Sequence, residues 1–363
     1  VWLGTGGDLV VEQLIGAERE VFRSNLPRHL SPWVLRQTTP FRCILSGNGM
    51  DLTVQGDSVL ILSPQQNLRL AFQGRFEPKY RGEQGGNRLL LDEEGGCGFF
   101  PIPQRPSTMQ RDSEKHSRWS LGFHLARWEE LWICVCPPRK RSPERYCQSI
   151  AHEGTAGDPY PSDELIEDAS RHCQILAIHE SWARDAPPWA DDPPGSEYEH
   201  PKPWETDRHE PADMEEFLRV RETAHRLGMK LVVYLSPLYS NAPDLLGEVR
   251  RVLDEYRVDG LYFDGWAGVR QDFRRHYRFI RQARSLLGDR ILYLHSSTEP
   301  FGTSRVYLPF VYAYADFVLS GEAGRFGLTL EEFLRYNVSQ YQISNSVGMW
   351  CHYGSWSDEP GYH

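Results

Sequence analysis

Polar and aromatic side chains follow the apolar runs in the second half of the sequence, where buried strands would end. These groups are His179-Glu180-Ser181-Trp182, Ser236, Asp264-Gly265-Trp266, His295 with Glu299 close behind, Glu322, and Trp350-Cys351-His352-Tyr353. Carboxylates can attack or protonate a glycosidic bond, while imidazoles and aromatic rings can hold sugar hydroxyls and ring faces. The pattern indicates a polar site assembled from several strand ends.

Asp264 is the sharpest candidate for a nucleophile. It ends the segment Val258-Asp259-Gly260-Leu261-Tyr262-Phe263-Asp264, and Gly265 beside it leaves room for a ligand. Asp259 precedes the apolar run and is interpreted as a turn or cap residue. In the alternative, structural interpretation, the carboxylate of Asp264 caps the following helix.

The segments Lys230-Leu231-Val232-Val233-Tyr234-Leu235-Ser236 and Gly260-Leu261-Tyr262-Phe263-Asp264-Gly265-Trp266 resemble the melibiase-type α-galactosidases and related α-retaining glycosidases. The resemblance implies a (β/α)₈ barrel in which the Asp at the end of the fourth strand is the nucleophile. It also implies an α-linked sugar as substrate, with galactose or N-acetylgalactosamine favoured. Many members carry an N-terminal β-sandwich, as we expect here.

A second carboxylate must act as the acid/base, and two residues are candidates. In the melibiase-like group the acid/base follows the sixth strand, which matches Glu322; in the amylase-like and endo-α-N-acetylgalactosaminidase-like group it follows the fifth, which matches Glu299. A retaining mechanism requires the two carboxyl groups to lie about 5–5.5 Å apart. We favour Glu322 and keep Glu299 as the alternative, with His295 or Tyr234 as donors that keep Asp264 ionised.

The remaining site candidates are expected to bind the sugar. They are His179, Glu180, Trp182, Tyr234, Trp266, His295, Trp350, His352 and Tyr353. The segment from Ala183 to Pro211 is longer than an ordinary loop of this fold and includes Asp185, Asp191 and Asp192. We interpret it as a lid on the substrate side.

Alternating strands and helices are expected to position these residues. The predicted strands are Leu131 to Cys136, Ile175 to Ile178, Leu231 to Leu235, Gly260 to Phe263, Ile291 to Leu294, Phe317 to Leu319 and Val347 to Cys351. Helical periodicity lies between them, for example after the N-cap candidate Asp213 and in the capping box at Thr329. The fold class is therefore α/β, with a (β/α)₈ TIM-type barrel over residues 129–363.

Residues 1–128 are predicted to form an antiparallel β-sandwich domain. Short apolar runs such as Val59 to Leu62 and Leu68 to Phe72 are bounded by turn residues. The stretch from Val10 to Phe22 fits either a helix or strands. The segments from Gly74 to Asn87 and from Gly95 to Lys115 are expected to be loops, because they are rich in Gly, Pro and charge.

The composition narrows the classes of molecule that the protein is expected to bind. The 363-residue chain has a formal net charge of −10, which disfavours nucleic acid, and aromatic residues make up 12%, which suits sugars. No apolar run is long enough to cross a membrane, so we expect a soluble protein, cytoplasmic or secreted with its leader absent. The 7 Cys have no paired CxxC spacing and are expected to be thiols.

Two other functions compete with a glycosidase that needs no cofactor or metal. A metal-dependent barrel hydrolase could use His179, His295, His352, Glu180 and Asp264 as zinc ligands. A non-catalytic carbohydrate-binding protein would use the same strand ends without cleavage. Metal analysis with chelator treatment and hydrolysis of aryl α-glycosides separate these alternatives, whereas the sequence leaves the oligomeric state open.

Overall fold

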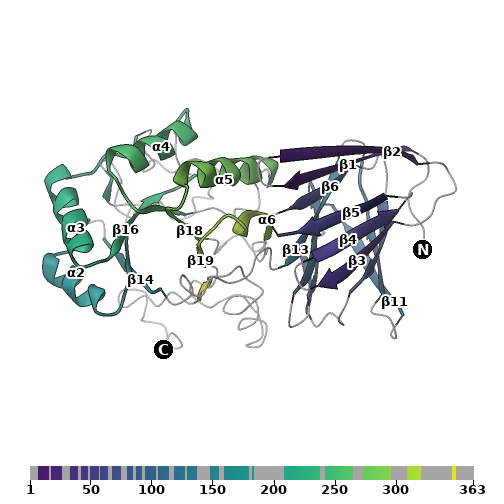
Figure 1. The fold of residues 1–363 in the computed structure, drawn as a ribbon, viewed down its shortest axis with the longest axis horizontal. Coiled ribbons are helices and arrows are strands. Elements are labelled where there is room, and N and C mark those ends of the chain that lie inside the picture. Colours follow the sequence, from purple (N-terminus) through teal and green to yellow (C-terminus); the bar gives the residue numbers. More distant parts are fainter. Residues whose placement is uncertain are drawn as a thin grey trace, which may run out of the picture.

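The computed structural model describes residues 7–15, 18–26, 33–39, 42–47, 50–56, 58–63, 68–74, 80–84, 87–91, 95–103, 105–113, 118–126, 129–136, 148–154, 159–179, 182–183, 208–237, 242–264, 273–295, 309–319 and 346–348. They form a mixed α/β molecule with two parts that follow one another in the sequence (Figure 1). The first part consists of strands alone, and the second combines a parallel sheet with helices. None of the helices in these residues is long and apolar enough to cross a membrane.

The first part is a sandwich of two sheets. The seven-stranded sheet has the order β2-β1-β6-β13-β10-β9-β8, and the six-stranded sheet has the order β11-β12-β7-β3-β4-β5. The strands are β1 Gly7–Ile15, β2 Glu18–Leu26, β3 Val34–Thr39, β4 Arg42–Gly47, β5 Met50–Gln55, β6 Val59–Ser63, β7 Leu68–Gln73, β8 Tyr80–Gln84, β9 Asn87–Leu91, β10 Gly96–Ile102, β11 Ser107–Ser113, β12 Arg118–Phe123 and β13 Glu130–Cys136. All pairs are antiparallel except β3 with β7.

One apolar core lies between the two sheets, because alternate side chains of a strand point to the same face. Leu70 and Phe72 of β7 pack in one cluster with Leu60 of β6 and Phe99 of β10. The rings of Phe72 and Phe99 meet edge to face with their centroids 5.8 Å apart. Two sheets that share a core thus form this part of the chain, and the expected antiparallel pairing holds for the described strand pairs except β3 with β7.

Four buried cysteines lie in the sandwich, at Cys43, Cys97, Cys134 and Cys136. They are free thiols, as is Cys173 in the second part, which agrees with the sequence-based expectation for these five; Cys147 and Cys351 lie outside the described residues. Burial raises the pKa of the Cys97 thiol, and contact with Cys43 raises it further. Such buried thiols are chemically inert.

Two segments that we expected to be loops contain strands. β8 lies within 74–87, and β10 and β11 lie within 95–115. β10 is fully buried between β9 and β13, so glycine and proline occur there in a central strand. β11 is a polar edge strand that pairs only with β12, and an edge strand needs no apolar alternation. The ambiguous stretch from Val10 to Phe22 belongs to β1 and β2.

The second part is built on a parallel sheet of seven strands in the order β14-β15-β16-β17-β18-β19-β20. The strands are β14 Ile150–Glu153, β15 Ile175–Ile178, β16 Lys230–Leu235, β17 Gly260–Phe263, β18 Ile291–His295, β19 Phe317–Leu319 and β20 Ser346–Gly348. Each pairs in parallel with the next. Within the described residues the pairing runs from β14 to β20 and does not close into a ring.

The predicted first strand of this sheet was wrong. Leu131 to Cys136 is part of β13, which pairs with β10 and β6 of the sandwich. Its continuous apolar run fits a strand buried on both faces in either fold, so periodicity alone could not assign it. The true first strand is β14, whose sequence Ile-Ala-His-Glu is too short and too polar to stand out. The other six predicted strands take their expected places in the order.

Helices α2 Asp163–Ser170, α3 Met214–Arg226, α4 Leu245–Glu255, α5 Phe273–Leu287 and α6 Pro309–Tyr312 accompany these strands. Figure 1 shows α2 to α5 around the outside of the parallel strands. Asp213 caps α3 as predicted, because its carboxylate accepts hydrogen bonds from the backbone N–H groups of Glu215 and Glu216. The capping box at Thr329 lies outside the described residues.

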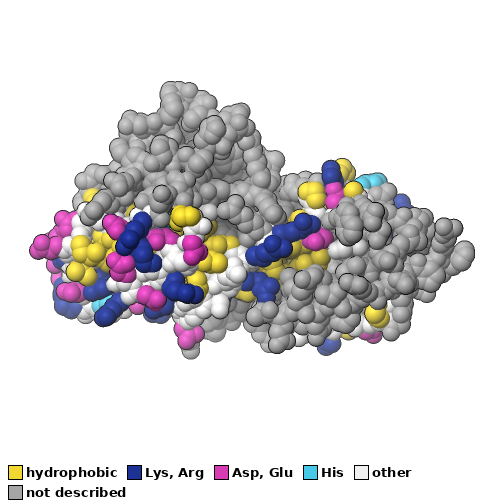
Figure 2. Space-filling model, turned by 90° about the horizontal axis from the view of Figure 1, so that it is seen from above, with side chains coloured by type: hydrophobic (Ala, Val, Ile, Leu, Met, Phe, Trp, Pro, Cys, Tyr) yellow, Lys and Arg dark blue, Asp and Glu magenta, His cyan; other side chains and the backbone are white. Residues whose placement is uncertain are grey.

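The face that carries α4 and α5 has charges of both signs. Figure 2 shows acidic and basic side chains interspersed over this end of the molecule. Some are ion pairs within one helix, such as Arg251 with Glu255 at 2.8 Å. Exposed pairs of this kind contribute about 0–1 kcal/mol each to stability.

A recurring arrangement fixes the amino-terminal edge of the parallel sheet. Asp259 precedes β17, and its carboxylate accepts a hydrogen bond from the backbone N–H of Leu231 in β16, at 2.8 Å, and contacts His225 of α3 at 2.7 Å. Asp316 precedes β19, and its carboxylate accepts a hydrogen bond from the backbone N–H of Leu292 in β18, at 2.9 Å. The same carboxylate pairs with Arg284 of α5 at 2.8 Å. Asp259, which we predicted to be a turn or cap residue, lies in a bend directly before β17.

The two parts of the molecule meet across the outer face of the seven-stranded sandwich sheet. Trp132 of β13 packs against Tyr277 of α5 and Phe310 of α6, each with ring centroids 5.3 Å apart. Beside these rings, Glu130 pairs with Arg274 at 2.9 Å and accepts the indole N–H of Trp132 at 2.8 Å. Aromatic rings therefore pack at this contact between the two parts, and the ion pair of Glu130 with Arg274 lies beside them.

Candidate active site

Asp264 lies directly after β17, in the middle of the parallel sheet. Gly260 at the start of β17 allows β18 to approach closely, since a Cβ atom there would lie 2.4 Å from the backbone oxygen of Ile291. At the other end, the hydroxyl of buried Ser236 donates to the backbone oxygen of Asp264 at 3.1 Å. The backbone that carries Asp264 is thus held from the neighbouring strand β16.

The carboxylate of Asp264 is in direct contact with His295 at the end of β18. Asp264 Oδ1 lies 2.6 Å from His295 Nδ1, and the two side chains are 16% and 9% exposed. A short contact of this kind is a charge-assisted hydrogen bond when the acid is ionised. The structure brings these two sequence-predicted residues together, and the carboxylate keeps some access to solvent.

Tyr262 of β17 also contacts His295, with its hydroxyl oxygen 2.9 Å from Nδ1. The ring of Tyr262 is stacked on that of Tyr293 from β18, with centroids 4.5 Å apart. The hydroxyl of Tyr293 lies 2.9 Å from His152 Nε2 on β14. A continuous series of contacts therefore runs from His152 through the two tyrosines and His295 to Asp264.

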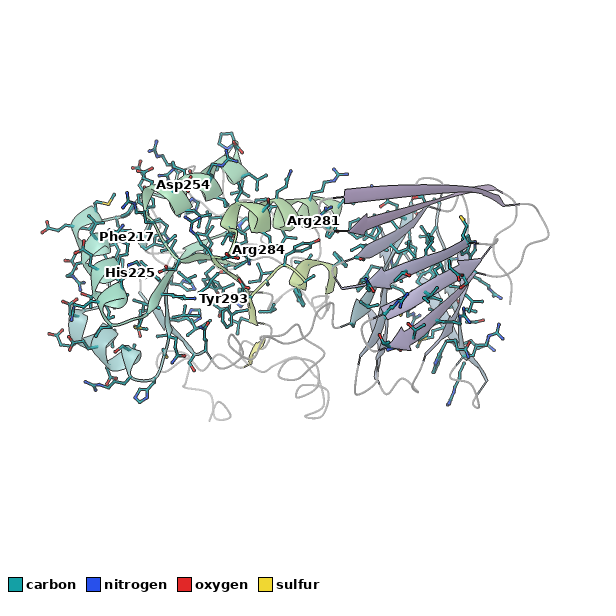
Figure 3. All side chains as sticks on the ribbon, viewed as in Figure 1. Phe217, His225, Asp254, Arg281, Arg284 and Tyr293 are labelled. Carbon is teal, nitrogen blue, oxygen red and sulfur yellow. The ribbon has the colours of Figure 1, made fainter. Side chains whose placement is uncertain are left out.

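Two more predicted residues join this group from β15 and β16. The ring of His179 lies 5.3 Å from that of Tyr234 and 5.8 Å from that of Tyr262, measured between centroids. Tyr234 meets Tyr262 edge to face at 5.8 Å. Figure 3 shows Tyr293 of the same group in the middle of the parallel-sheet part. Imidazole and phenol rings from β14 to β18 and the residues after them therefore pack together in one group.

Trp182 has a different place from the one expected. Its side chain is fully buried against Phe217 and Tyr256, and its indole N–H donates to the backbone oxygen of Tyr234 at 2.9 Å. A ring that is covered on all sides and has used its N–H packs the core between sheet and helices. The buried position of Trp182 contradicts its expected role as a sugar contact.

Both ends of the predicted lid segment are anchored at the same place. Ala183 pairs with Pro211, and the backbone N–H of Ala212 donates to the oxygen of Trp182 at 2.8 Å. Two residues before Pro211, the backbone N–H of His209 donates to the carboxylate of Glu248 on α4 at 2.6 Å. This carboxylate also pairs with Arg251 at 2.7 Å. The lid residues Asp185, Asp191 and Asp192 lie outside the described residues.

The other predicted site residues also lie outside the described residues. They are both acid/base candidates, Glu322 and Glu299, together with Glu180, Trp266, Trp350, His352 and Tyr353. Within the described ranges, no group of three or more His, Cys, Asp or Glu side chains is arranged to hold a metal ion. The zinc alternative used His352 and Glu180, which fall outside these ranges.

Sequence reasoning missed His152, Tyr262 and Tyr293. Tyr234, Tyr262 and Tyr293 are register partners on three adjacent strands, which puts them side by side across the sheet. The signal in the sequence was a tyrosine inside each of three otherwise apolar strands, in Val-Val-Tyr-Leu, Leu-Tyr-Phe and Leu-Tyr-Leu. His152 could not be found because β14 itself was not recognised.

No protein-family model matches the chain, and no curated protein matches it. Similar solved structures include a cycloalternan-degrading enzyme from Trueperella pyogenes, with 11% identity, 88% of this chain and 66% of that chain covered, and a TM-score of 0.38. The glucosidase II alpha subunit has 9% identity, with 92% and 53% covered and a TM-score of 0.38. A GH31 family sulfoquinovosidase from E. rectale has 11% identity, with 88% and 64% covered and a TM-score of 0.37.

The chain spans between about half and two thirds of the length of these three structures. At this level of similarity, the likenesses establish neither an activity nor a substrate for this chain.

Proposed function

We propose that the protein is a glycoside hydrolase that cleaves an α-linked sugar by a retaining mechanism, with Asp264 as the nucleophile. The observation that carries the proposal is the partly exposed carboxylate of Asp264 at the end of a central strand, 2.6 Å from His295. Active sites of α/β proteins form at the carboxyl ends of parallel strands. The resemblance of the segments around Tyr234 and Asp264 to melibiase-type enzymes supports the same role.

We further propose that the parallel sheet closes into a (β/α)₈ barrel. In the order of the sheet, β14 and β18 are separated by three strands, yet His152 of β14 and Tyr293 of β18 lie 2.9 Å apart. Adjacent strands are about 4.8 Å apart, so these strands would be nearly 20 Å apart in a flat sheet. Only a strongly curved sheet allows this contact, and a barrel interior filled by side chains has that curvature.

The boundary between the two domains, predicted at 128, stays a proposal. The pairing of β13 with sandwich strands favours a boundary between Cys136 and Ile150, after β13 and before β14.

In the proposed reaction, an oxygen of Asp264 attacks the anomeric carbon while the acid/base donates its proton to the leaving oxygen. The glycosidic C–O bond breaks, and a glycosyl ester forms on Asp264. In the second step the same acid/base takes a proton from water, whose oxygen displaces the ester. We assign the acid/base role to Glu322, with Glu299 as the alternative.

Asp264 must be ionised for attack, and the hydrogen bond from His295 favours the ionised form. His179, Tyr234 and the aromatic residues outside the described ranges, Trp266, Trp350 and Tyr353, are the proposed sugar contacts, with Glu180 and His352. Galactose or N-acetylgalactosamine is the favoured sugar, from the resemblance of the sequence.

A panel of nitrophenyl α- and β-glycosides tests the function. We expect hydrolysis of an α-glycoside, with the α-anomer as the first product seen by NMR. Replacing Asp264 with Asn should lower kcat by roughly 10³-fold or more without changing the melting temperature much. The matched control is Asp254→Asn, an exposed carboxylate of α4 that should leave activity unchanged (Figure 3).

Glu322→Gln should lower kcat by about 10²–10⁴-fold on natural glycosides and much less on activated aryl glycosides. If Glu299→Gln has this pattern and Glu322→Gln does not, the acid/base role belongs to Glu299. Full activity of Asp264→Asn would refute the glycosidase proposal. Loss of activity on chelation would favour the metal-dependent hydrolase, and sugar binding without turnover of any glycoside would favour the carbohydrate-binding protein.

A further inference from the structure

His295 Nδ1 serves two oxygen atoms at once. It lies 2.6 Å from Asp264 Oδ1 and 2.9 Å from the hydroxyl oxygen of Tyr262. A ring nitrogen of histidine either carries a proton and donates, or carries a lone pair and accepts. The two contacts therefore constrain where the proton of His295 can lie.

The contact with Asp264 decides the position of the proton while the acid is ionised. A carboxylate accepts hydrogen bonds and donates none, so Nδ1 must carry the proton and donate it to Oδ1. In that state the phenol oxygen of Tyr262 can only accept from the same N–H. Without the carboxylate, Nδ1 is free to lose its proton and accept the O–H of Tyr262.

Tyr262 can either accept from Nδ1 or donate to it, because its ring is held in place by the rings around it. The ring is fully buried, stacked 4.5 Å from Tyr293, and the hydroxyl of Tyr293 is in turn 2.9 Å from His152. Among the described residues, the rings of His179 after β15, Tyr234 on β16 and His152 on β14 also pack against Tyr262. The phenol group of Tyr262 thus stays within reach of Nδ1 in both states.

We propose that Asp264 selects the Nδ1-protonated form of His295, and that Tyr262 becomes the hydrogen-bond donor to this nitrogen when the carboxylate is absent. Tyr262 and His295 are then positioning residues, because they hold Oδ1 of Asp264 in one orientation. This catalytic consequence rests on the proposed function, whereas the position of the proton does not.

The position of the proton is measured by two-bond ¹H–¹⁵N NMR of ¹⁵N-histidine-labelled protein at pH 8, where ordinary histidines are neutral. The His295 signals are assigned by their loss in His295→Gln. We expect a proton-bearing Nδ1 in the wild type and a proton-free Nδ1 in Asp264→Ala. Asp254→Ala is the matched control and should leave the His295 signals unchanged.

The role of Tyr262 is tested with Tyr262→Phe, which keeps the stacked ring and removes the hydroxyl. In the Asp264→Ala background we expect it to abolish the preference for the proton-free Nδ1. In the otherwise wild-type enzyme it should lower kcat roughly five- to tenfold with little change in KM, because one neutral hydrogen bond is lost.

A proton-free Nδ1 in the wild type overturns the proposal, and so does a proton-bearing Nδ1 in Asp264→Ala. Neither result depends on a substrate, so this failure is distinct from failure of the glycosidase proposal. Conversely, the expected NMR signals in a protein that hydrolyses no glycoside would leave the proton arrangement standing and remove its catalytic consequence.

Discussion

At the scale of single residues, the buried carboxylate of Glu248 is held by specific partners. Glu248 of α4 is almost fully buried and receives hydrogen bonds from Arg251 and from the backbone N–H of His209. Burial raises the pKa of Glu248, but the hydrogen bonds and charge of Arg251 and the hydrogen bonds from His209 outweigh it and lower the pKa to about 2. The residue links the stem of the segment 183–211 to helix α4.

Replacing Glu248 with Gln should therefore destabilise the protein in a pH-dependent way. The carboxyl pKa falls from its usual 4.5 to about 2 on folding. Its contribution is fully present above pH 4.5 and is lost as the pH falls toward 2, and at pH 7 it amounts to about 3 kcal/mol. Urea unfolding at pH 7 and pH 3 measures the difference between wild type and variant, which should shrink at the lower pH.

Glu255→Gln is the control for this prediction, because Glu255 is the more exposed second carboxylate of Arg251. It should cost less than about 1 kcal/mol. An equal loss in both variants, or a Glu248→Gln loss that is the same at pH 7 and pH 3, would contradict the assigned cause.

At the scale of elements, Asp316 shows how one side chain can anchor a strand. It lies before β19, accepts a hydrogen bond from the backbone N–H of Leu292, and pairs with Arg284, which Figure 3 shows on α5.

We expect Asp316→Asn to lower the free energy of unfolding by about 2–4 kcal/mol, because Arg284 is left in a largely buried place without its charge partner. Asp259→Asn, the same change at the more exposed equivalent site, should cost less. Thermal unfolding of both variants provides the comparison; equal losses would contradict burial as the reason.

The elements also show which parts of the fold could be predicted from sequence. β15 to β19 and helices α3 and α4 follow clear periodicity, so their order and the strand-end position of Asp264 could be predicted. β13 and β14 could not be assigned, since an apolar run fits either sheet and a short polar strand has no periodic signal. The partnership of Asp264 with His295 was expected only as one of two donors, because the choice depends on how β17 and β18 lie in register.

At the scale of the whole molecule, the contact between the two parts depends on a few aromatic rings. Trp132 is buried between Tyr277 and Phe310, and Phe100 meets Phe310 with centroids 5.1 Å apart. Because these rings belong to both the sandwich and the helices, the two parts should unfold together.

Trp132→Ala should uncouple them. We expect a loss of about 3–5 kcal/mol and a calorimetric transition that separates into two, because a large buried ring is removed from the interface. Trp132→Phe keeps an aromatic ring and should retain one transition. A single transition in Trp132→Ala, shifted no more than in Trp132→Phe, would show that the interface does not couple the two parts.

The anchors at Asp259 and Asp316 have one more consequence. Asp259, which precedes β17, binds the start of β16 and contacts His225 of α3. Asp316, which precedes β19, binds the start of β18 and pairs with Arg284 of α5, so the second anchor lies two strands after the first. The same arrangement thus occurs twice at the amino-terminal edge, with histidine as the basic residue in one copy and arginine in the other. Two successive strand pairs, β16 with β17 and β18 with β19, are therefore each joined at their amino-terminal ends by an aspartate side chain.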